Sequence, residues 1–299
     1  MVWRLGAIAA DAGEQVVVEL EGRLYALADL LGGGEGPTLA EVFDEWARWR
    51  GELDRLTADP AADSLDADAV RWLPPLPATA TVVCAGANYA AHRSEMGEAA
   101  ARPEFPYAFV KPRRSLSGHR EQVEIPARAE WVDWEGELGV VIGSGGRDLE
   151  GASAAAAIAG FCQFNDVSAR DWIDASRAAG MIDMFVQKGF DGFGPVGPLV
   201  TPSHFVADPQ DLGLQLAVNG VVKQDSSTAQ MTFSVLELVA HVSSVTTLRP
   251  GDLIATGSPP GVGFGRDPRE RLADGDVVTL QIERLGPALE TRMFAARSR

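Results

Sequence analysis

Two glutamates one residue apart are the feature of this chain best suited to chemistry. Glu135 and Glu137 lie in the segment WEGELGVVIG (134–143), which otherwise has the apolar pattern of a core strand. Alternate residues of a β-strand point to the same face, so both carboxylates should project side by side. Burying two like charges together costs several kcal/mol unless a cation lies between them. The pair predicts a divalent-cation site; the alternative is an edge strand whose glutamates face water.

A third acid, Asp166, ends an apolar run that has the pattern of a buried strand. Its carboxylate should therefore also emerge at the rim of the core. Three carboxylates suit a hard cation, Mg²⁺ or Mn²⁺, and leave about three of the six octahedral positions for water and ligand. Such an open site is typical of catalysis. Taken alone, Asp166 could equally be a turn or cap residue ahead of Arg170.

His92 and Glu95 form a second candidate pair. A spacing of three residues on a short helix puts both side chains on one face, within reach of each other. A carboxylate beside an imidazole raises its basicity and fixes its orientation, which suits a general base that takes a proton from water. The alternatives are a solvated helical face and a second metal site with two protein ligands.

Lysine is scarce in this sequence, and its three positions are Lys111, Lys188 and Lys223. Lys188 is followed by glycine and aromatic residues, a setting that suits a ligand-binding cation. Near a metal, such a cation can hold a carboxylate or stabilise an enolate oxygen. The simpler interpretation is a salt bridge between Lys188 and Asp191.

The loop TGSPPGVG (256–263) follows an expected strand, and its backbone N–H groups and hydroxyls could hold a carboxylate. An ordinary turn would use the same residues. Residues 192–197 also match G-x-G-x-x-G. Pro195 and Pro198 interrupt the helix that a dinucleotide-binding motif must open, so we discount that match.

Composition narrows the classes of function. A net charge of −16 argues against nucleic acid and anionic membranes as partners, and favours a small ligand or a metal. The sequence contains no run of roughly 20 apolar residues and no signal-peptide pattern at its start, so we expect a cytoplasmic protein. Cys84 and Cys162 lie in apolar surroundings, which indicates buried, reduced thiols and not a disulfide.

The elements that must position these residues are mostly strands. The patterns predict strands at 16–20, 24–27, 81–84, 108–110, 138–142, 214–218, 252–255 and 277–282, and helices at 39–56, 153–158 and 235–242. The proline-rich stretch 73–77 separates a small N-terminal α+β domain (1–77) from the metal-dependent catalytic domain (78–299). Strands and helices do not alternate regularly, which favours a mixed α/β, predominantly β fold over a doubly wound parallel sheet.

Taken in order, the motifs N-Y-x-x-H-x-x-E, E-x-E-L, D-x-S-A-R-D, K-x-F-D and A-T-G-S-P-x-G-V-G resemble those of the fumarylacetoacetate hydrolase superfamily over residues 80–283. The resemblance implies a mixed β-sandwich roll and usually a homodimer. It also implies a divalent metal on Glu135, Glu137 and Asp166, and a His92–Glu95 dyad on a lid that orders over the substrate.

The same resemblance supplies the residues expected to contact substrate, namely Tyr89, Arg170, Thr256, Gly257 and Ser258, beside the catalytic residue Lys188. Two departures stand out. Many members that act on small oxoacids have glutamine shortly after A-R-D, where this chain has Ile173, so one polar contact to substrate is expected to be missing. The loop that commonly reads T-G-T-P has serine at position 258.

The leading hypothesis is a metal-dependent hydrolase that cleaves a carbon–carbon bond in a 2,4-dioxo acid of the acylpyruvate type. Its substrate would be a small 2-oxo or 2,4-dioxo acid, and its cofactor Mg²⁺ or Mn²⁺. One rival is a decarboxylase or isomerase of related 2-oxo acids, of the oxaloacetate or hydroxymuconate type, which uses the same enolate chemistry without attack by water. Another is a non-catalytic protein in which the cation is structural.

Overall fold

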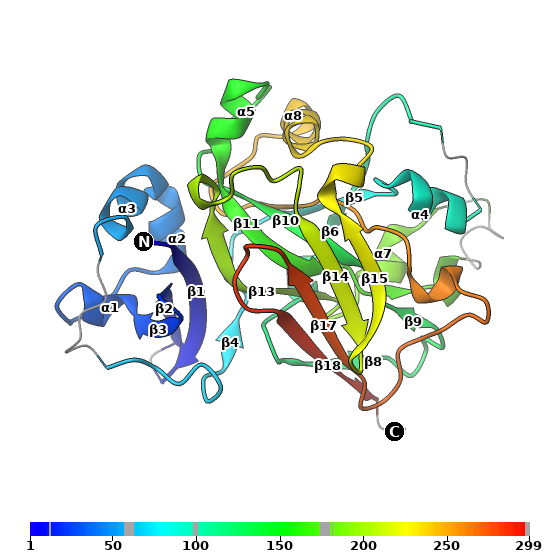
Figure 1. Cartoon of the computed structure of the whole chain (residues 1–299), viewed down its shortest axis with the longest axis horizontal. Coiled ribbons are helices and arrows are strands. Elements are labelled where there is room, and N and C mark those ends of the chain that lie inside the picture. Colours follow the sequence, from blue (N-terminus) through cyan, green and yellow to red (C-terminus); the bar gives the residue numbers. More distant parts are fainter. Residues whose placement is uncertain (12, 57–62, 98–100, 174–179, 181, 297–299) are drawn as a thin grey trace.

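The computed structural model describes residues 1–11, 13–56, 63–97, 101–173, 180 and 182–296 (Figure 1). The strands are β1 (Trp3–Ala10), β2 (Gly13–Leu20), β3 (Arg23–Ala26), β4 (Trp72–Leu73), β5 (Val82–Gly86), β6 (Tyr107–Lys111), β7 (Leu116–Ser117), β8 (Gln122–Ile125), β9 (Val132–Asp133), β10 (Gly136–Ile142), β11 (Ile158–Asn165), β12 (Ser168–Ala169), β13 (Gly194–Pro202), β14 (Gly213–Val218), β15 (Val221–Ser227), β16 (Leu253–Ala255), β17 (Val277–Ile282) and β18 (Leu289–Ala295). The helices are α1 (Leu27–Leu30), α2 (Leu39–Asp44), α3 (Trp46–Leu53), α4 (Ala90–Glu95), α5 (Ala152–Ala157), α7 (Met184–Lys188) and α8 (Val235–Val245), with 3₁₀ turns η1 (Arg113–Ser115), η2 (Ser203–Phe205), η3 (Thr228–Gln230) and η4 (Gly263–Gly265).

A large mixed sheet runs through the molecule in the order β3-β2-β1-β13-β11-β10-β16-β5-β6, with β4 paired to β1 and β7 to β13. Most neighbours are antiparallel, and β16 pairs with β5 in parallel. The N-terminal strands join the rest of the chain where β1 pairs with β13 through Leu5 and Val200. Residues on both sides of the expected domain boundary near residue 77 therefore contribute strands to the same sheet. That domain boundary stays a prediction.

A second sheet, in the order β15-β14-β17-β18-β8, packs against β10, β11 and β13 (Figure 1). The strand β10 is buried on both faces: Leu138 and Val140 belong to the core cluster shared with the second sheet, and Val141 to the cluster shared with the N-terminal helices. Gly136 faces the second sheet so closely that a Cβ there would lie 2.8 Å from Cδ1 of Leu280. The side chains on either side of Gly136 therefore point to the opposite face.

The expected helix at 39–56 is divided in the structure. The helix α2 ends at Asp44, and α3 begins at Trp46, because Glu45 leaves the helical region with φ −112° and ψ 36°. The apolar residues Val42, Trp46, Trp49 and Leu53 of the two helices are nevertheless buried. Trp46 stacks on Phe43 with ring centroids 5.6 Å apart. Both short helices cover the N-terminal end of the sheet (Figure 1).

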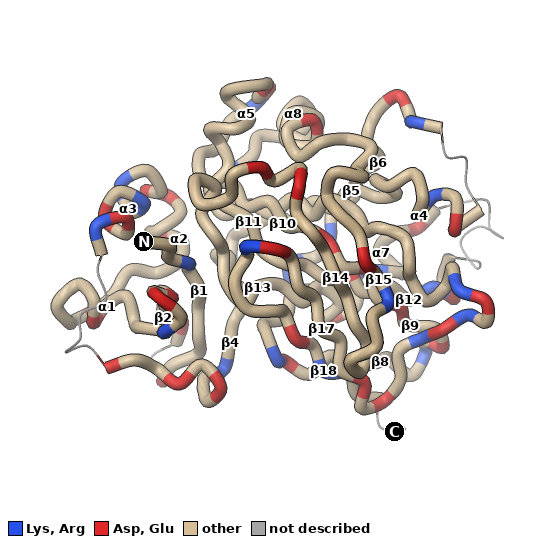
Figure 2. The backbone as a smooth tube through the Cα atoms, viewed as in Figure 1, with Lys and Arg blue, Asp and Glu red and all other residues tan. Residues whose placement is uncertain are grey.

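The mixed, predominantly β fold predicted from the sequence is confirmed. Cys84 and Cys162 are free and buried, as expected. Figure 2 shows charged residues along the helices and loops, whereas the central strand β11 contains none. Across the described ranges, helices of the length and apolarity needed to cross a membrane are absent.

Candidate active site

The antiparallel register of β10 and β11 brings the three predicted carboxylates together. Gly136 lies opposite Asn165, so Asp166 follows directly beside Glu135, and its backbone N–H donates to the Glu135 carbonyl at 2.9 Å. One oxygen of each of Glu135, Glu137 and Asp166 lies within 4.8 Å of the others. All three side chains are buried. The expected convergence is present, and metal binding by this triad stays a prediction.

Three buried cations surround the triad. The Lys188 ammonium lies 2.5 Å from Oε2 of Glu135 and 2.5 Å from Oδ2 of Asp166. Lys111 donates to Oδ1 of Asp166 at 2.7 Å, and Arg170 donates to Oε1 of Glu135. Lys188 thus contacts two of the proposed metal ligands, at the end of helix α7 and beneath the Phe109 ring.

The electrostatics of the triad test whether a cation fits. Burial alone would raise the pKa of Glu135, but the charges of Arg170 and Lys188 outweigh it and hold that pKa well below its usual range. Burial, reinforced by the negative charge of Asp166, instead raises the pKa of Glu137 well above its ordinary value. Its Oε2 accepts a hydrogen bond from the Gly257 N–H at 2.8 Å. A buried carboxylate with excess negative potential beside two others is a donor set that fits Mg²⁺ or Mn²⁺.

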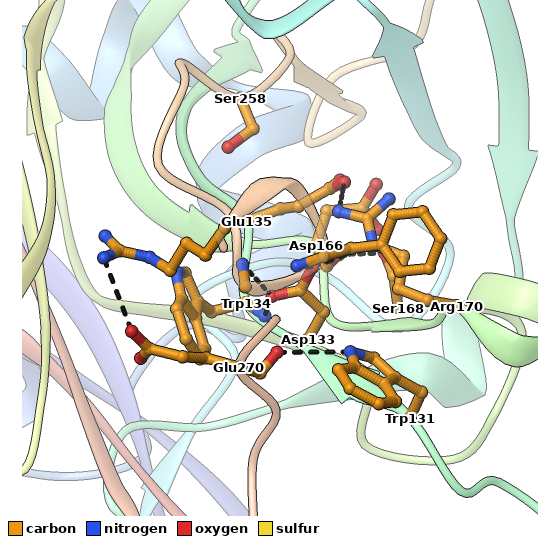
Figure 3. A network of polar contacts seen from close by, with 12 residues as sticks. Trp131, Asp133, Trp134, Glu135, Asp166, Ser168, Arg170, Ser258 and Glu270 are labelled. Atoms are coloured by element: carbon orange, nitrogen blue, oxygen red, sulfur yellow. Dashed lines mark hydrogen bonds and ion pairs between the residues drawn. The ribbon is translucent and has the colours of Figure 1, made fainter. Parts of the chain in front are cut away.

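Arg170 connects the triad to Asp133, a residue that the sequence analysis did not single out (Figure 3). Its Nε donates to Oδ2 of Asp133 at 2.9 Å while its terminal nitrogen reaches Glu135. Asp133 is fully buried. The expected substrate contact Arg170 is therefore held between two acids of its own chain, where it fixes the position of Glu135.

The predicted pair His92 and Glu95 is in contact on helix α4. Nδ1 of His92 lies 2.8 Å from Oε1 of Glu95, and Oε2 of Glu95 accepts from the Gly261 N–H at 2.9 Å. His92 is buried and lines the same cavity as the carboxylate triad. With Nδ1 engaged, Nε2 is the nitrogen available to take a proton.

The loop after β16 joins these parts through its backbone. It donates N–H groups to acidic side chains from three separate segments: Gly257 to Glu137, Gly261 to Glu95, and Gly263 with Phe264 to Asp133. Gly257 has φ +92°, and a Cβ there would lie 2.7 Å from Cβ of Asn88, so this position requires glycine. A single loop therefore contacts one member of the carboxylate triad, the glutamate of the His92–Glu95 pair, and Asp133, the partner of Arg170.

The other expected substrate contacts have different surroundings. The Thr256 hydroxyl donates to the Leu138 carbonyl at 3.0 Å, within the sheet. Ser258 lines the cavity, and its Oγ accepts from Gln224 at 2.8 Å. Tyr89 is buried, and among the described residues its hydroxyl has no hydrogen-bond partner. Substrate contact by each of these residues stays a prediction.

The cavity measures about 280 Å³, and its lining includes both His92 and the three carboxylates of the triad. Its polar lining consists of His92, Arg93, Glu135, Glu137, Asp166, Arg170, Gln187, Lys188 and Ser258. Ile173, noted as a departure from the family pattern, also lines it and is 8% exposed.

Two residues that contact the predicted site were not identified from the sequence, namely Asp133 and Lys111. Asp133 continues the alternation of Glu135 and Glu137, so the period of two already contained it. Lys111 directly follows the predicted strand 108–110, ends the observed strand β6 and is one of the three lysines of the sequence. Its partner Asp166 is 55 positions away, and sequence spacing alone does not predict that contact.

The structure thus combines two packed β-sheets with an acid-rich cavity, where the buried carboxylate triad lies beside a histidine held by a glutamate. The sequence model described as "Fumarylacetoacetate (FAA) hydrolase C-terminal" matches residues 81–292. The chain belongs to the fumarylacetoacetate hydrolase family.

Relatives in this family have different activities. A mitochondrial oxaloacetate tautomerase of Homo sapiens is 42% identical over 217 residues, covering 73% of this chain and 68% of the relative. The structure resembles that of 5-carboxymethyl-2-hydroxymuconate delta-isomerase from Mycobacterium smegmatis, with TM-score 0.73, 33% identity, and 99% and 100% of the two chains covered. It also resembles maleylpyruvate hydrolase from Sphingobium sp. SYK-6 in complex with manganese(II) and pyruvate, with TM-score 0.78, 25% identity, and 98% and 100% covered.

Proposed function

We propose that this protein is a divalent-metal-dependent hydrolase that cleaves the carbon–carbon bond of an acylpyruvate-type 2,4-dioxo acid. The products would be pyruvate and the carboxylic acid derived from the acyl group. The observation that carries this proposal is that His92, held by Glu95, lines the same cavity as the carboxylate triad. A base for water and an anionic cation-binding cluster are the two components that hydrolysis of this bond needs.

The histidine and glutamate would act on water. Glu95 holds Nδ1 of His92 at 2.8 Å, so Nε2 takes the proton as the hydroxide adds to the 4-oxo carbon. The bond between the acyl carbon and the pyruvyl methylene then breaks, and its electron pair forms the pyruvate enolate. The proton held by His92 returns to the enolate carbon, which completes pyruvate.

Lys188 would oppose the negative charge on the departing enolate. Burial alone would lower its pKa, but Asp166 and Glu135 outweigh burial and raise it, so the ammonium stays charged at neutral pH. A divalent cation on Glu135, Glu137 and Asp166 would supply further Lewis-acid polarisation of the substrate oxygens. The manganese bound by the maleylpyruvate hydrolase neighbour supports Mn²⁺ as the first ion to test.

Turnover of acylpyruvates with added Mn²⁺ or Mg²⁺, in water enriched in heavy oxygen, tests the proposal. We expect one labelled oxygen in the released carboxylic acid and none added to pyruvate by the cleavage itself, measured before exchange. His92→Ala and Glu135→Ala should each abolish turnover, whereas His241→Ala, on helix α8 outside the cavity, should not. Retained activity in either of the first two variants refutes the assigned roles.

The second candidate is a tautomerase, isomerase or decarboxylase of a related 2-oxo acid. It is supported by the 42% identity to the human oxaloacetate tautomerase and by the isomerase neighbour. The same experiment in water enriched in heavy oxygen distinguishes the two candidates, because a product with no added water, or released CO₂, favours the second. Metal-dependent thermal stability without turnover of any acid in the panel would instead favour a non-catalytic metal-binding protein.

The homodimer implied by the family remains part of the proposal. Light scattering at several concentrations measures it directly, with twice the chain mass of 31.7 kDa as the expected value.

A further inference from the structure

The cavity has two chemically different regions. Its floor is formed by the carboxylate triad and Lys188, all at most 5% exposed. Among the described residues, the rest of the lining includes apolar or aromatic side chains: Met96, Tyr107, Ile173, Ile182, Met184 and Phe233. Ile182 is 70% exposed and Tyr107 45%, which places these two at the mouth. A substrate with its 2-oxo acid end at the floor would therefore extend its acyl group along an apolar wall.

Among the residues that the structure describes, the cationic groups that line this cavity already have protein partners. Arg170 and Lys188 contact Asp133, Glu135 and Asp166. The guanidinium of Arg93 donates to the backbone carbonyl of Ala87 at 2.7 Å and to other oxygens of its own chain. A second carboxylate at the outer wall would lose hydration and gain apolar neighbours in exchange, which is unfavourable.

The charge of the floor favours the same conclusion. Lys111, Arg170 and Lys188 form ion pairs with three carboxylates, those of Asp133, Glu135 and Asp166. These pairs leave no excess of positive charge at the floor for a second substrate carboxylate, in a chain whose net charge is already −16.

We propose that the acyl group of the substrate is an uncharged hydrocarbon chain, so the enzyme takes monocarboxylic acylpyruvates in preference to dicarboxylic 2-oxo acids. This inference rests on the proposed function for its choice of reaction. This preference differs from the compounds in the names of the relatives: oxaloacetate and maleylpyruvate have two carboxylates, and 5-carboxymethyl-2-hydroxymuconate has three.

Paired substrates measure the preference. An alkanoylpyruvate is compared with the acylpyruvate of equal chain length that ends in a second carboxylate, both with saturating Mn²⁺. We expect kcat/KM to be at least tenfold higher for the alkanoylpyruvate. It should also rise about threefold to fourfold per added methylene, until the alkyl chain extends beyond the apolar lining of the cavity. Equal values, or a preference for the dicarboxylate, would overturn the inference.

A matched pair of variants localises the effect. Ile182→Arg adds a cation at the mouth, and Val245→Arg adds one at a similarly exposed site, 68% against 70%, at the end of α8. The first variant should reduce the preference for the hydrocarbon by several-fold or more, and the second should leave it unchanged. Equal effects of both variants would contradict the role of the outer wall.

Binding separates this inference from the proposed reaction. An N-alkyl oxamate keeps the carboxylate beside a carbonyl group but lacks the dioxo unit that is cleaved. Calorimetry in Mn²⁺ compares it with the same oxamate ending in a carboxylate. Tighter binding of the alkyl compound without turnover of any acylpyruvate would disprove the reaction and retain the ligand preference. Tighter binding of the dicarboxylate would disprove the preference even if hydrolysis occurs.

Discussion

Replacing Asp133 by asparagine is expected to destabilise the protein and to weaken its affinity for metal. The Asp133 carboxylate accepts four hydrogen bonds: from the Trp134 N–H at 2.8 Å and the Gly263 N–H at 2.7 Å on Oδ1, and from the Phe264 N–H at 3.0 Å and Arg170 Nε at 2.9 Å on Oδ2. All four neighbours donate. An asparagine keeps one oxygen and turns an NH₂ group toward two of them, whichever way the amide is oriented.

The magnitude follows from the groups left without an acceptor. Each unsatisfied buried donor costs about 1–3 kcal/mol, and loss of one partner of a buried ion pair costs about 3–5 kcal/mol in total. We therefore expect Asp133→Asn to lower the free energy of unfolding by roughly 3–5 kcal/mol. The released Arg170 guanidinium should also interact more strongly with Glu135, so calorimetry should measure a weaker Mn²⁺ affinity.

Urea unfolding without metal gives the first quantity, and titration of the folded variant with Mn²⁺ gives the second. Asp148→Asn is the matched control, because its carboxylate is 73% exposed and 3.9 Å from Arg147. Such a surface pair contributes at most about 1 kcal/mol. A loss of stability in Asp133→Asn no larger than in this control would refute the argument from four buried donors. Unchanged Mn²⁺ affinity would refute the link between Arg170 and the triad.

Three further outcomes follow from individual residues. Burial lowers the pKa of His119 to about 4, so between pH 6.5 and 4 the unfolded chain binds a proton that the folded chain does not. The free energy of unfolding should therefore fall by up to about 3 kcal/mol as the pH decreases over this range. Urea unfolding at each pH measures this fall, which should be smaller in the variant His119→Asn. Gly261→Ala should lower stability by roughly 1–3 kcal/mol and reduce kcat, because φ is +105° and a Cβ would lie 2.3 Å from the Lys223 carbonyl; wild-type unfolding and kcat values would contradict this. Burial raises the pKa of Cys162 to about 12 and that of Cys84 well above its usual range, so a thiol reagent should label neither in the native protein and both in urea.

The prediction of the strands succeeded where a short apolar or alternating run lies between charged or glycine residues. The strand β17 was predicted at its observed bounds, and β10 differs from the prediction only at its start. The central strand β13 was missed because Pro195, Pro198 and Pro202 interrupt its pattern. Proline disfavours a central strand because it donates no ladder hydrogen bond, and here tertiary pairing with β11 and β1 prevails over that preference.

The prediction of the site depended on the same periodicity. Alternation placed Glu135 and Glu137 on one face, and the end of an apolar run placed Asp166 at the rim. The ion pairs of Lys188 were not predicted: the spacing suggested Asp191, whereas the structure pairs Lys188 with Glu135 and Asp166. Local spacing favours a partner three residues away, but the fold brings the end of helix α7 to Glu135, just before β10, and to Asp166, just after β11. Burial makes those pairs stronger.

The loop after β16 explains why the site could be only partly derived from side chains. Its contributions to Glu137, Glu95 and Asp133 are backbone N–H groups, which every residue except proline carries, so no residue type identifies them. What the sequence retains is glycine at 257 and 261, where positive φ and close approach exclude a side chain. Because one loop holds both the base-orienting glutamate and a triad carboxylate, a shift of its backbone would displace the two groups together. Their separation is therefore set by the loop, and the reaction proposed here depends on that separation.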